Sequence, residues 1–149
     1  MNDRCILGGY MVDENVSRLV GVFTFFASLL FLAFPSPWLA AAIALDFVPR
    51  ALGKASSSPS VIAGSALRRL LGLPESLVNA GPKQFAAKLG LMMSMAILLL
   101  SVAGVPGAAL GLAALLAACA ALEGFVGFCV GCLLYSLLMR ARERLATIR

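Results

Sequence analysis

Long apolar stretches constrain the fold of this chain more than any other feature of its sequence. Residues 108–139 contain no proline and a single charged residue, Glu123, and a helix of this length would extend roughly 50 Å. Three further apolar stretches cover residues 13–34, 37–52 and 83–103. A bilayer core of about 30 Å is crossed by about 20 apolar helical residues. Because only 13% of the residues are charged, against about a quarter in a typical soluble domain, the sequence predicts an integral membrane protein.

The predicted fold is all-α, a bundle of four transmembrane helices in a single membrane domain that covers residues 1–149. Pro35-Ser-Pro37 separates the first two helices, and Gly104-Val-Pro-Gly107 separates the last two. The fourth helix exceeds the bilayer thickness, so it must tilt, protrude or bend near Gly124 or Gly127. No loop signal divides it into two crossings.

Residues 53–81 form the longest connection between apolar stretches. Within it, residues 60–73 combine apolar side chains at helical spacing with Arg68 and Arg69. This pattern predicts an amphipathic helix that lies flat on the membrane surface. A plain loop is the alternative.

The basic residues predict the orientation of the chain in the membrane. They lie in the N-terminal lead, in and around the connection at residues 53–81, and in the tail from Arg140, whereas the short turns near residues 36 and 105 carry none. By the positive-inside rule, both termini and the long connection lie in the cytoplasm. The net charge of +5 therefore reflects orientation in a lipid bilayer, and no nucleic-acid partner is expected.

Small residues form one continuous stripe along the predicted fourth helix: Ala113, Ala117, Ala120, Gly124, Gly127 and Gly131. Such residues let helix backbones approach closely within a membrane. The stripe therefore predicts close packing, either with the second helix of this chain or with a second protomer in a homo-oligomer.

Cys129 and Cys132 are the candidate reactive pair. Thiol–disulfide exchange needs a thiolate and a second thiol within reach, so this Cys-x-x-Cys pair is a candidate for redox or sulfur-transfer chemistry. Soft-metal binding and plain packing are the alternatives. In the C-terminal half of an apolar helix, burial and the helix dipole would both raise the thiol pKa, unless the helix breaks between Gly124 and Gly127.

The other two cysteines differ in their predicted depth. The predicted topology places Cys5 at the same cytoplasmic face as Cys129 and Cys132, where it could act as a third exchange thiol or as a metal ligand. Cys119 is predicted to lie deeper in the bilayer and is expected to be inert. The chain has no histidine, which removes the commonest metal ligand and the usual axial ligand of haem. No cofactor is predicted.

Ionisable side chains near the membrane form a second candidate constellation: Asp46, Arg50, Lys83, Lys88 and Glu123. Charges inside a membrane are costly and are therefore candidates for function. Asp46 and Arg50 are four residues apart and can pair on one helix face. We expect a structural ion-pair network that ties helices together near the cytoplasmic face, because a proton path would need a longer series of such groups.

Four motifs together carry a family resemblance: Val-Asp-Glu-Asn-Val-x-Arg-Leu at 12–19, Asp-Phe-x-x-Arg at 46–50, Asn-Ala-Gly-Pro-Lys-x-Phe-Ala at 79–86 and Leu-Glu-x-x-x-Gly-Phe-Cys-x-Gly-Cys at 122–132. With these motifs the chain resembles a family of small bacterial integral membrane proteins described only as a domain of unknown function. In size and number of helices it is also similar to the DoxX-like family of four-helix proteins, which is associated with thiol and sulfur oxidation.

The resemblances imply a bacterial inner-membrane protein, of a kind that sometimes occurs beside thioredoxin-like or sulfurtransferase proteins, which slightly favours a thiol function. The favoured function is a thiol protein that exchanges electrons or sulfur with a cytosolic thioredoxin-like or sulfur-carrier partner through Cys129, Cys132 and Cys5. One alternative is a transporter of a soft metal or a small solute, with the same thiols as transient ligands. Another is a structural or assembly subunit of a membrane complex.

Overall fold

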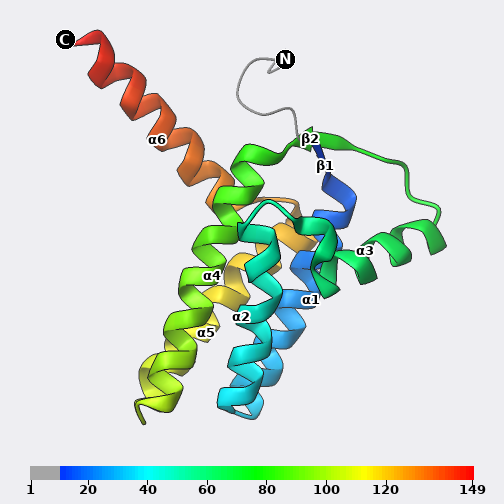
Figure 1. The fold of residues 1–149 in the computed structure, drawn as a ribbon, viewed down its shortest axis with the longest axis vertical. Coiled ribbons are helices and arrows are strands. Elements are labelled where there is room, and N and C mark those ends of the chain that lie inside the picture. Colours follow the sequence, from blue (N-terminus) through cyan, green and yellow to red (C-terminus); the bar gives the residue numbers. More distant parts are fainter. Residues whose placement is uncertain (1–10) are drawn as a thin grey trace.

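The computed structural model describes residues 11–149, and helices dominate this part of the chain (Figure 1). In chain order the elements are β1 (Met11–Asp13), α1 (Glu14–Ala33), α2 (Pro37–Ala51), the 3₁₀ turn η1 (Ala55–Ser57), α3 (Pro59–Leu70), β2 (Leu77–Asn79), α4 (Ala80–Val102), α5 (Pro106–Ala121), the π-helical turn η2 (Leu122–Val126) and α6 (Val130–Thr147). The long helices run side by side, and α3 and α6 project away from them.

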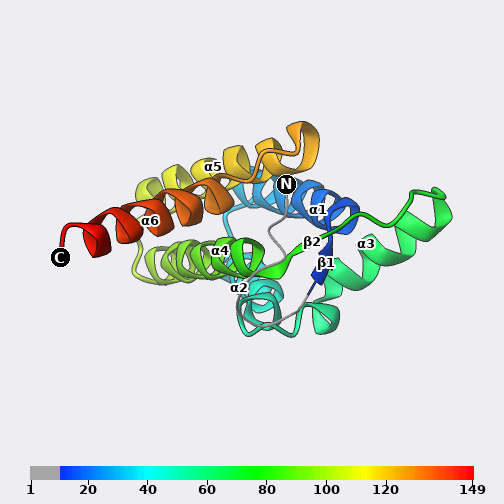
Figure 2. The ribbon, with the colours of Figure 1, turned by 90° about the horizontal axis from the view of Figure 1, so that it is seen from above.

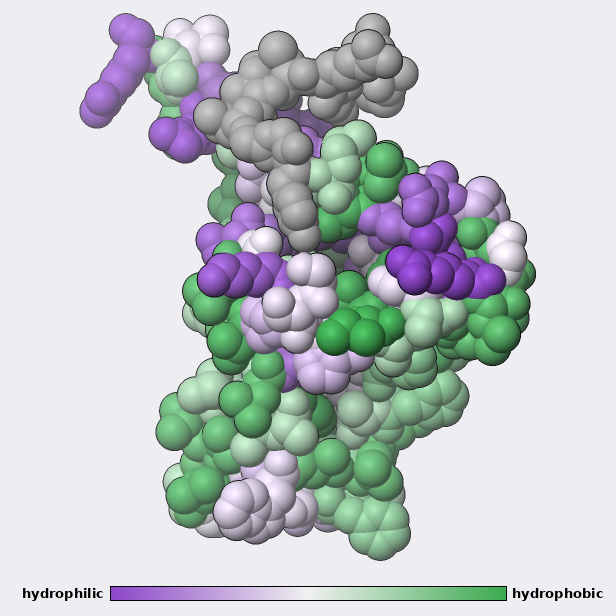
Figure 3. Space-filling view, turned by 45° about the vertical axis from the view of Figure 1, so that its right-hand side comes forward, coloured by the Kyte–Doolittle hydropathy of each residue, from purple (hydrophilic) through white to green (hydrophobic). Residues whose placement is uncertain are grey.

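Three helical segments of the described chain are long and apolar enough to cross a membrane: α1, α4, and α5 together with η2. Figure 3 shows apolar residues covering the lower part of one face of the molecule, with hydrophilic residues gathered toward the upper end. This division of the surface is compatible with a lipid bilayer around the lower part of the long helices.

The helix predicted at residues 37–52 is α2. Its 15 residues extend about 22 Å, which is less than the thickness of a bilayer core. Pro49 lies in its last turn without ending it, and the helix ends at Ala51, shortly before Gly53, whose φ of +78° turns the chain out of the helix. α2 packs along α4 and also contacts α1.

One hydrophobic core joins α1, α2, α4 and α5. Phe31 of α1 and Ile97 of α4 are almost completely buried in it. The buried residues from the other two helices are Ala40, Ile43 and Phe47 of α2 and Ala109, Ala113 and Leu116 of α5. The small side chains on α5 allow its backbone to approach its neighbours closely.

Two short strands pair at one end of the bundle. β1 and β2 are antiparallel, with Met11 opposite Asn79, and each strand leads directly into a capped helix. Asp13 accepts a hydrogen bond from the Asn15 backbone N–H at 2.9 Å, and Asn79 accepts one from the Gly81 N–H at 3.0 Å. The position of Asp13 before the first apolar run predicts its N-cap role, which is confirmed. Strands of three residues are too short to show the alternation of apolar and polar side chains that indicates a strand, so the sequence does not predict this pairing.

The amphipathic segment predicted at residues 60–73 forms the helix α3, so the plain-loop alternative is wrong. α3 projects sideways from the bundle in both ribbon views (Figures 1 and 2). Gly64 is its buried residue, and a Cβ added there would lie 3.4 Å from side-chain atoms of Val16 and Val20 on α1. This close approach sets the point where α3 crosses α1.

The helix predicted over residues 108–139 is not continuous, and the chain bends at Gly127, one of the two positions that the sequence analysis gave for a bend. α5 gives way to the π-helical turn η2, and Gly127 then turns the chain with a φ of +76°. The Gly127 and Phe128 backbone N–H groups both donate to the Leu122 carbonyl oxygen, the latter at 3.0 Å. Residues with a Cβ rarely adopt this left-handed conformation, so glycine ends the helix here. α6 leaves the turn in a direction different from that of α5.

Candidate functional site

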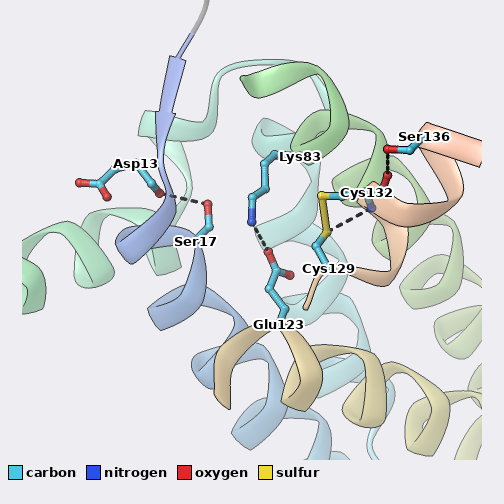
Figure 4. Close-up of a disulfide and its surroundings, with 7 residues drawn as sticks. All are labelled: Asp13, Ser17, Lys83, Glu123, Cys129, Cys132 and Ser136. Atoms are coloured by element: carbon cyan, nitrogen blue, oxygen red, sulfur yellow. Dashed lines mark hydrogen bonds and ion pairs between the residues drawn. A yellow bond between two sulfur atoms is a disulfide. The ribbon is translucent and has the colours of Figure 1, made fainter. Parts of the chain in front are cut away.

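Cys129 and Cys132 lie at the beginning of α6, directly after the turn at Gly127. Cys129 is the N-cap residue, with φ −89° and ψ 106°, and its Sγ accepts a hydrogen bond from the Cys132 backbone N–H at 3.2 Å. The two sulfur atoms form a disulfide (Figure 4), and the Cα atoms are 5.2 Å apart, within the usual range of about 4.4–6.8 Å. Because Cys129 is extended rather than helical, the two thiols meet without any distortion of the helix.

This position corrects the one that the sequence predicted for the pair. The break at Gly127 moves the cysteines from the C-terminal half of a long helix to the N-terminal end of a new one. Free backbone N–H groups and the helix dipole stabilise a thiolate at such an end. Both cysteines are partly exposed, so a second reactant can reach them.

A cavity of about 800 Å³ lies beside the pair, with Cys129 on its wall. The N-terminal halves of α1 and α4, the C-terminal ends of α2 and α5, and parts of α3 and α6 contribute to the wall. Most of its lining is apolar, and its charged residues include Arg50, Lys83 and Glu123. The cavity therefore brings Cys129 and part of the predicted ionic constellation to one place.

The predicted ion-pair network divides into two separate pairs. Lys83 Nζ of α4 lies 3.2 Å from Glu123 Oε1 of η2 (Figure 4). Arg50 Nη1 lies 3.5 Å from Asp46 Oδ2 on the same helix, α2. Lys88 is exposed and forms no ion pair with any residue of the described range 11–149. Only the Lys83–Glu123 pair therefore joins two helical elements.

The carboxylate of Asp46 has further partners at the start of α3. The hydroxyl groups of Ser58 and Ser60 donate to it at 2.7 and 2.6 Å, and the Ser60 backbone N–H donates at 3.0 Å. These bonds fasten the end of α2 to the beginning of α3. The sequence analysis missed both serines because the region reads as a Ser-rich linker. The available signal was a serine directly before a proline, which is typical of a helix start.

The guanidinium of Arg50 has fewer hydrogen-bond partners than the carboxylate of Asp46. Its Nη1 atom is buried and has no hydrogen-bond partner among residues 11–149, since its contact with Asp46 is only an ion pair. Its Cζ atom lies 4.6 Å from the centroid of the Phe47 ring. A buried donor without a partner is uncommon and calls for an explanation.

The predicted small-residue stripe contacts two other helices of the same chain. A Cβ added at Gly124 would lie 2.8 Å from the backbone nitrogen of Val22 on α1, and one added at Gly131 would lie 2.5 Å from the Cβ of Ala86 on α4. Gly127 forms the turn instead of a packing contact. The remaining members are buried on α5: Ala113, Ala117 and Ala120. The glycines of the stripe therefore pack on α1 and α4 rather than on the second helix.

The other two cysteines do not join the Cys129–Cys132 pair in the described structure. Cys5 lies outside the described residues. Cys119 is a free thiol, partly exposed, on the wall of the cavity. Residues 11–149 contain no group of three or more Cys, Asp or Glu side chains that could hold a metal ion.

Comparisons with known proteins place the chain in a family. Neither the curated proteins nor the solved structures gave a match. A model of the family described as Domain of unknown function (DUF4395) matches residues 12–140, a range that contains all four sequence motifs and both cysteines of the pair. The chain therefore belongs to the DUF4395 family.

Proposed function

We propose that this protein is a small bacterial inner-membrane thiol protein that exchanges electrons or sulfur with a cytosolic thioredoxin-like or sulfur-carrier protein through Cys129 and Cys132. The observation that carries the proposal is the position of the pair at the start of α6, with the Cys132 N–H bonded to the Cys129 sulfur. Cysteines that served only as packing residues would gain nothing from a helix N-terminus, whereas an exchange thiol gains a stabilised thiolate.

The chemistry follows from the two thiols. In the reduced protein, the Cys129 thiolate attacks a partner disulfide, forming a mixed disulfide and releasing one partner thiolate. The Cys132 thiolate then attacks the Cys129 sulfur, which frees the second partner thiolate and leaves the Cys129–Cys132 bond. Two electrons thereby pass to the partner, and the reverse sequence returns them. For sulfur transfer, the Cys129 thiolate takes the terminal sulfur of a partner persulfide and releases the partner thiolate.

The proposed orientation gives a cytosolic partner access to the pair. In it α1, α2, α4 and α5 with η2 cross the membrane, α3 lies on the inner surface, and both termini and residues 53–81 are cytoplasmic. The distribution of charge supports this orientation, because Arg50, Arg68 and Lys83 all lie toward the end of the bundle that carries the disulfide. Three of the four crossings also meet the length and hydropathy that a membrane requires.

Exchange with a reduced thioredoxin tests the proposal. The full chain in lipid nanodiscs, first oxidised with diamide, should be reduced stoichiometrically, and mass mapping should locate the change at Cys129 and Cys132. Cys132→Ser, incubated instead with oxidised thioredoxin, should accumulate a mixed disulfide, because the Cys129 thiolate opens the thioredoxin disulfide and Cys132 is absent to displace the partner. Cys119→Ser is the matched control and should exchange like the wild type.

Failure of both reduction and mixed-disulfide formation would remove the proposed function. Titration of the reduced protein with Zn²⁺ or Cu⁺ addresses the transport alternative. Stoichiometric thiolate–metal absorption that disappears in Cys129→Ser would favour transient metal binding over exchange.

A further inference from the structure

The cavity beside the disulfide has the size and lining of a ligand site. Its volume of about 800 Å³ falls within the range of about 300–1,000 Å³ that small-molecule sites occupy. Apolar side chains such as Val20 of α1, Met93 of α4 and Leu116 of α5 line it. Because these three helices are the ones suited to cross a membrane, a lipid-soluble molecule is the class of ligand that fits this wall.

The polar groups of the cavity suit a neutral oxygen acceptor better than an anion. The ammonium of Lys83 is already paired with Glu123, and the guanidinium of Arg50 with Asp46. Asp13 and Arg69 add one charge of each sign to the wall. Because Lys83 and Arg50 each already have a carboxylate beside them, an anion would gain little from either cation. A carbonyl oxygen of a ligand, in contrast, would give the buried Nη1 of Arg50 the hydrogen bond it lacks among the described residues.

The sulfur of Cys129 lies on the wall of the cavity, so a ligand there lies beside one of the two thiols that would exchange electrons. We propose that the cavity binds a membrane quinone and that this quinone oxidises the Cys129–Cys132 dithiol. The inference rests on the proposed thiol function and names the electron acceptor for it. The ring and the first part of the tail lie against the apolar wall, and the ring carbonyl oxygens face Arg50 and Lys83.

The step is balanced. The two thiols lose two electrons and two protons and form the S–S bond, while the quinone takes up both electrons and both protons and becomes a hydroquinone. A hydrogen bond from the buried Nη1 of Arg50 stabilises the negative charge that develops on the ring oxygen before it is protonated. A cytosolic dithiol partner then reduces the disulfide again, so electrons pass from the cytosol to the lipid-soluble carrier.

The test measures quinone reduction by the dithiothreitol-reduced and desalted full chain in nanodiscs. The probe is a short-tailed benzoquinone with every ring position substituted, so that thiols cannot add to the ring. We expect one hydroquinone for each Cys129–Cys132 disulfide formed. Two serines provide a matched pair of variants, because each donates its hydroxyl to the carbonyl four residues earlier in its own helix: Ser17 to Asp13 at 3.2 Å and Ser101 to Ile97 at 2.8 Å.

Ser17 lies on the cavity wall and Ser101 does not. Ser17→Phe should therefore slow quinone reduction at least about tenfold, the effect of losing about 1.4 kcal/mol of binding, while Ser101→Phe should not. Elution as a single species and an unchanged melting temperature would show that both variants fold. Equal rates in the two variants, or no hydroquinone from a wild-type protein that still exchanges with thioredoxin, would overturn the quinone site alone. A wild type that fails to exchange with thioredoxin would overturn the thiol function itself.

Discussion

Lys83 and Glu123 form an ion pair of 3.2 Å between α4 and the π-helical turn, and their side chains are only 19% and 18% exposed. The turn that contains Glu123 leads through Gly127 to the disulfide, so this pair ties the segment before the disulfide to α4. Removal of one partner would leave the other charge partly buried and unpaired.

Replacement of Glu123 tests this relationship. Glu123→Leu should lower the free energy of unfolding by about 1–3 kcal/mol, because it leaves the Lys83 ammonium without an acceptor. Glu123→Gln should cost less, since the amide oxygen still accepts a hydrogen bond. Denaturant unfolding in detergent measures both. Glu143→Leu on the exposed part of α6 is the control and should change stability by less than about 0.5 kcal/mol. Equal stability of all four proteins would show that the pair contributes nothing.

Gly127 should be intolerant of any side chain. Its φ of +76° is unfavourable for other residues, and an added Cβ would lie 3.0 Å from Nη2 of Arg18. Gly127→Ala should therefore destabilise the protein by about 1–2 kcal/mol. Gly111→Ala, in α5 with no atom near its added Cβ, should be neutral or slightly stabilising because alanine favours the helix. Thermal unfolding compares the two, and a smaller loss at Gly127 than at Gly111 would contradict the assigned turn.

Gly131 should control the seating of α6 on α4. An added Cβ would lie 2.5 Å from Cβ and 2.7 Å from Cα of Ala86, so Gly131→Ala should cost about 1–3 kcal/mol through overpacking. Ala86→Gly combined with Gly131→Ala should restore part of the loss, because it removes the nearer of the two contacts. Hydrogen exchange of the first turns of α6 provides the readout. Absence of any rescue would mean that α6 does not rest on Ala86.

The proposed orientation predicts opposite accessibility for two serines. In an otherwise cysteine-free protein, Ser57→Cys should react with a membrane-impermeant thiol reagent only in inverted vesicles, and Ser36→Cys only in intact cells. Ser57 is exposed and follows α2, whereas Ser36 lies in the turn between α1 and α2. Labelling of Ser57→Cys in intact cells would reverse the orientation and remove the cytosolic partner from the proposal.

The sequence predicts those elements that depend on local signals. Asp13 precedes an apolar run and caps α1, and the prolines near residues 36 and 106 separate helices as expected. The pairing of β1 with β2 depends on contacts between residues more than sixty positions apart. Three residues carry too little pattern to reveal such a contact.

The break in the helix before the disulfide shows a different limit of prediction from the sequence. Gly124, Gly127 and Gly131 fit a packing stripe on one continuous helix equally well, and nothing local distinguishes that arrangement from a turn. In the structure they have different roles, because Gly124 in η2 contacts α1 and Gly131 in α6 contacts α4, whereas Gly127 forms the turn between them. The sequence therefore identifies Cys129 and Cys132 as a pair, while their place at a helix start depends on tertiary contacts.

The Cys129–Cys132 bond closes a very small ring, since the two residues are three positions apart. The loop entropy that a cross-link removes from the unfolded chain grows with the length of the loop, and for so short a loop it corresponds to only about 2 kcal/mol. Opening the bond therefore removes little stability, because the packing of the helices stabilises the fold. Opening or closing this bond therefore requires no unfolding of the molecule.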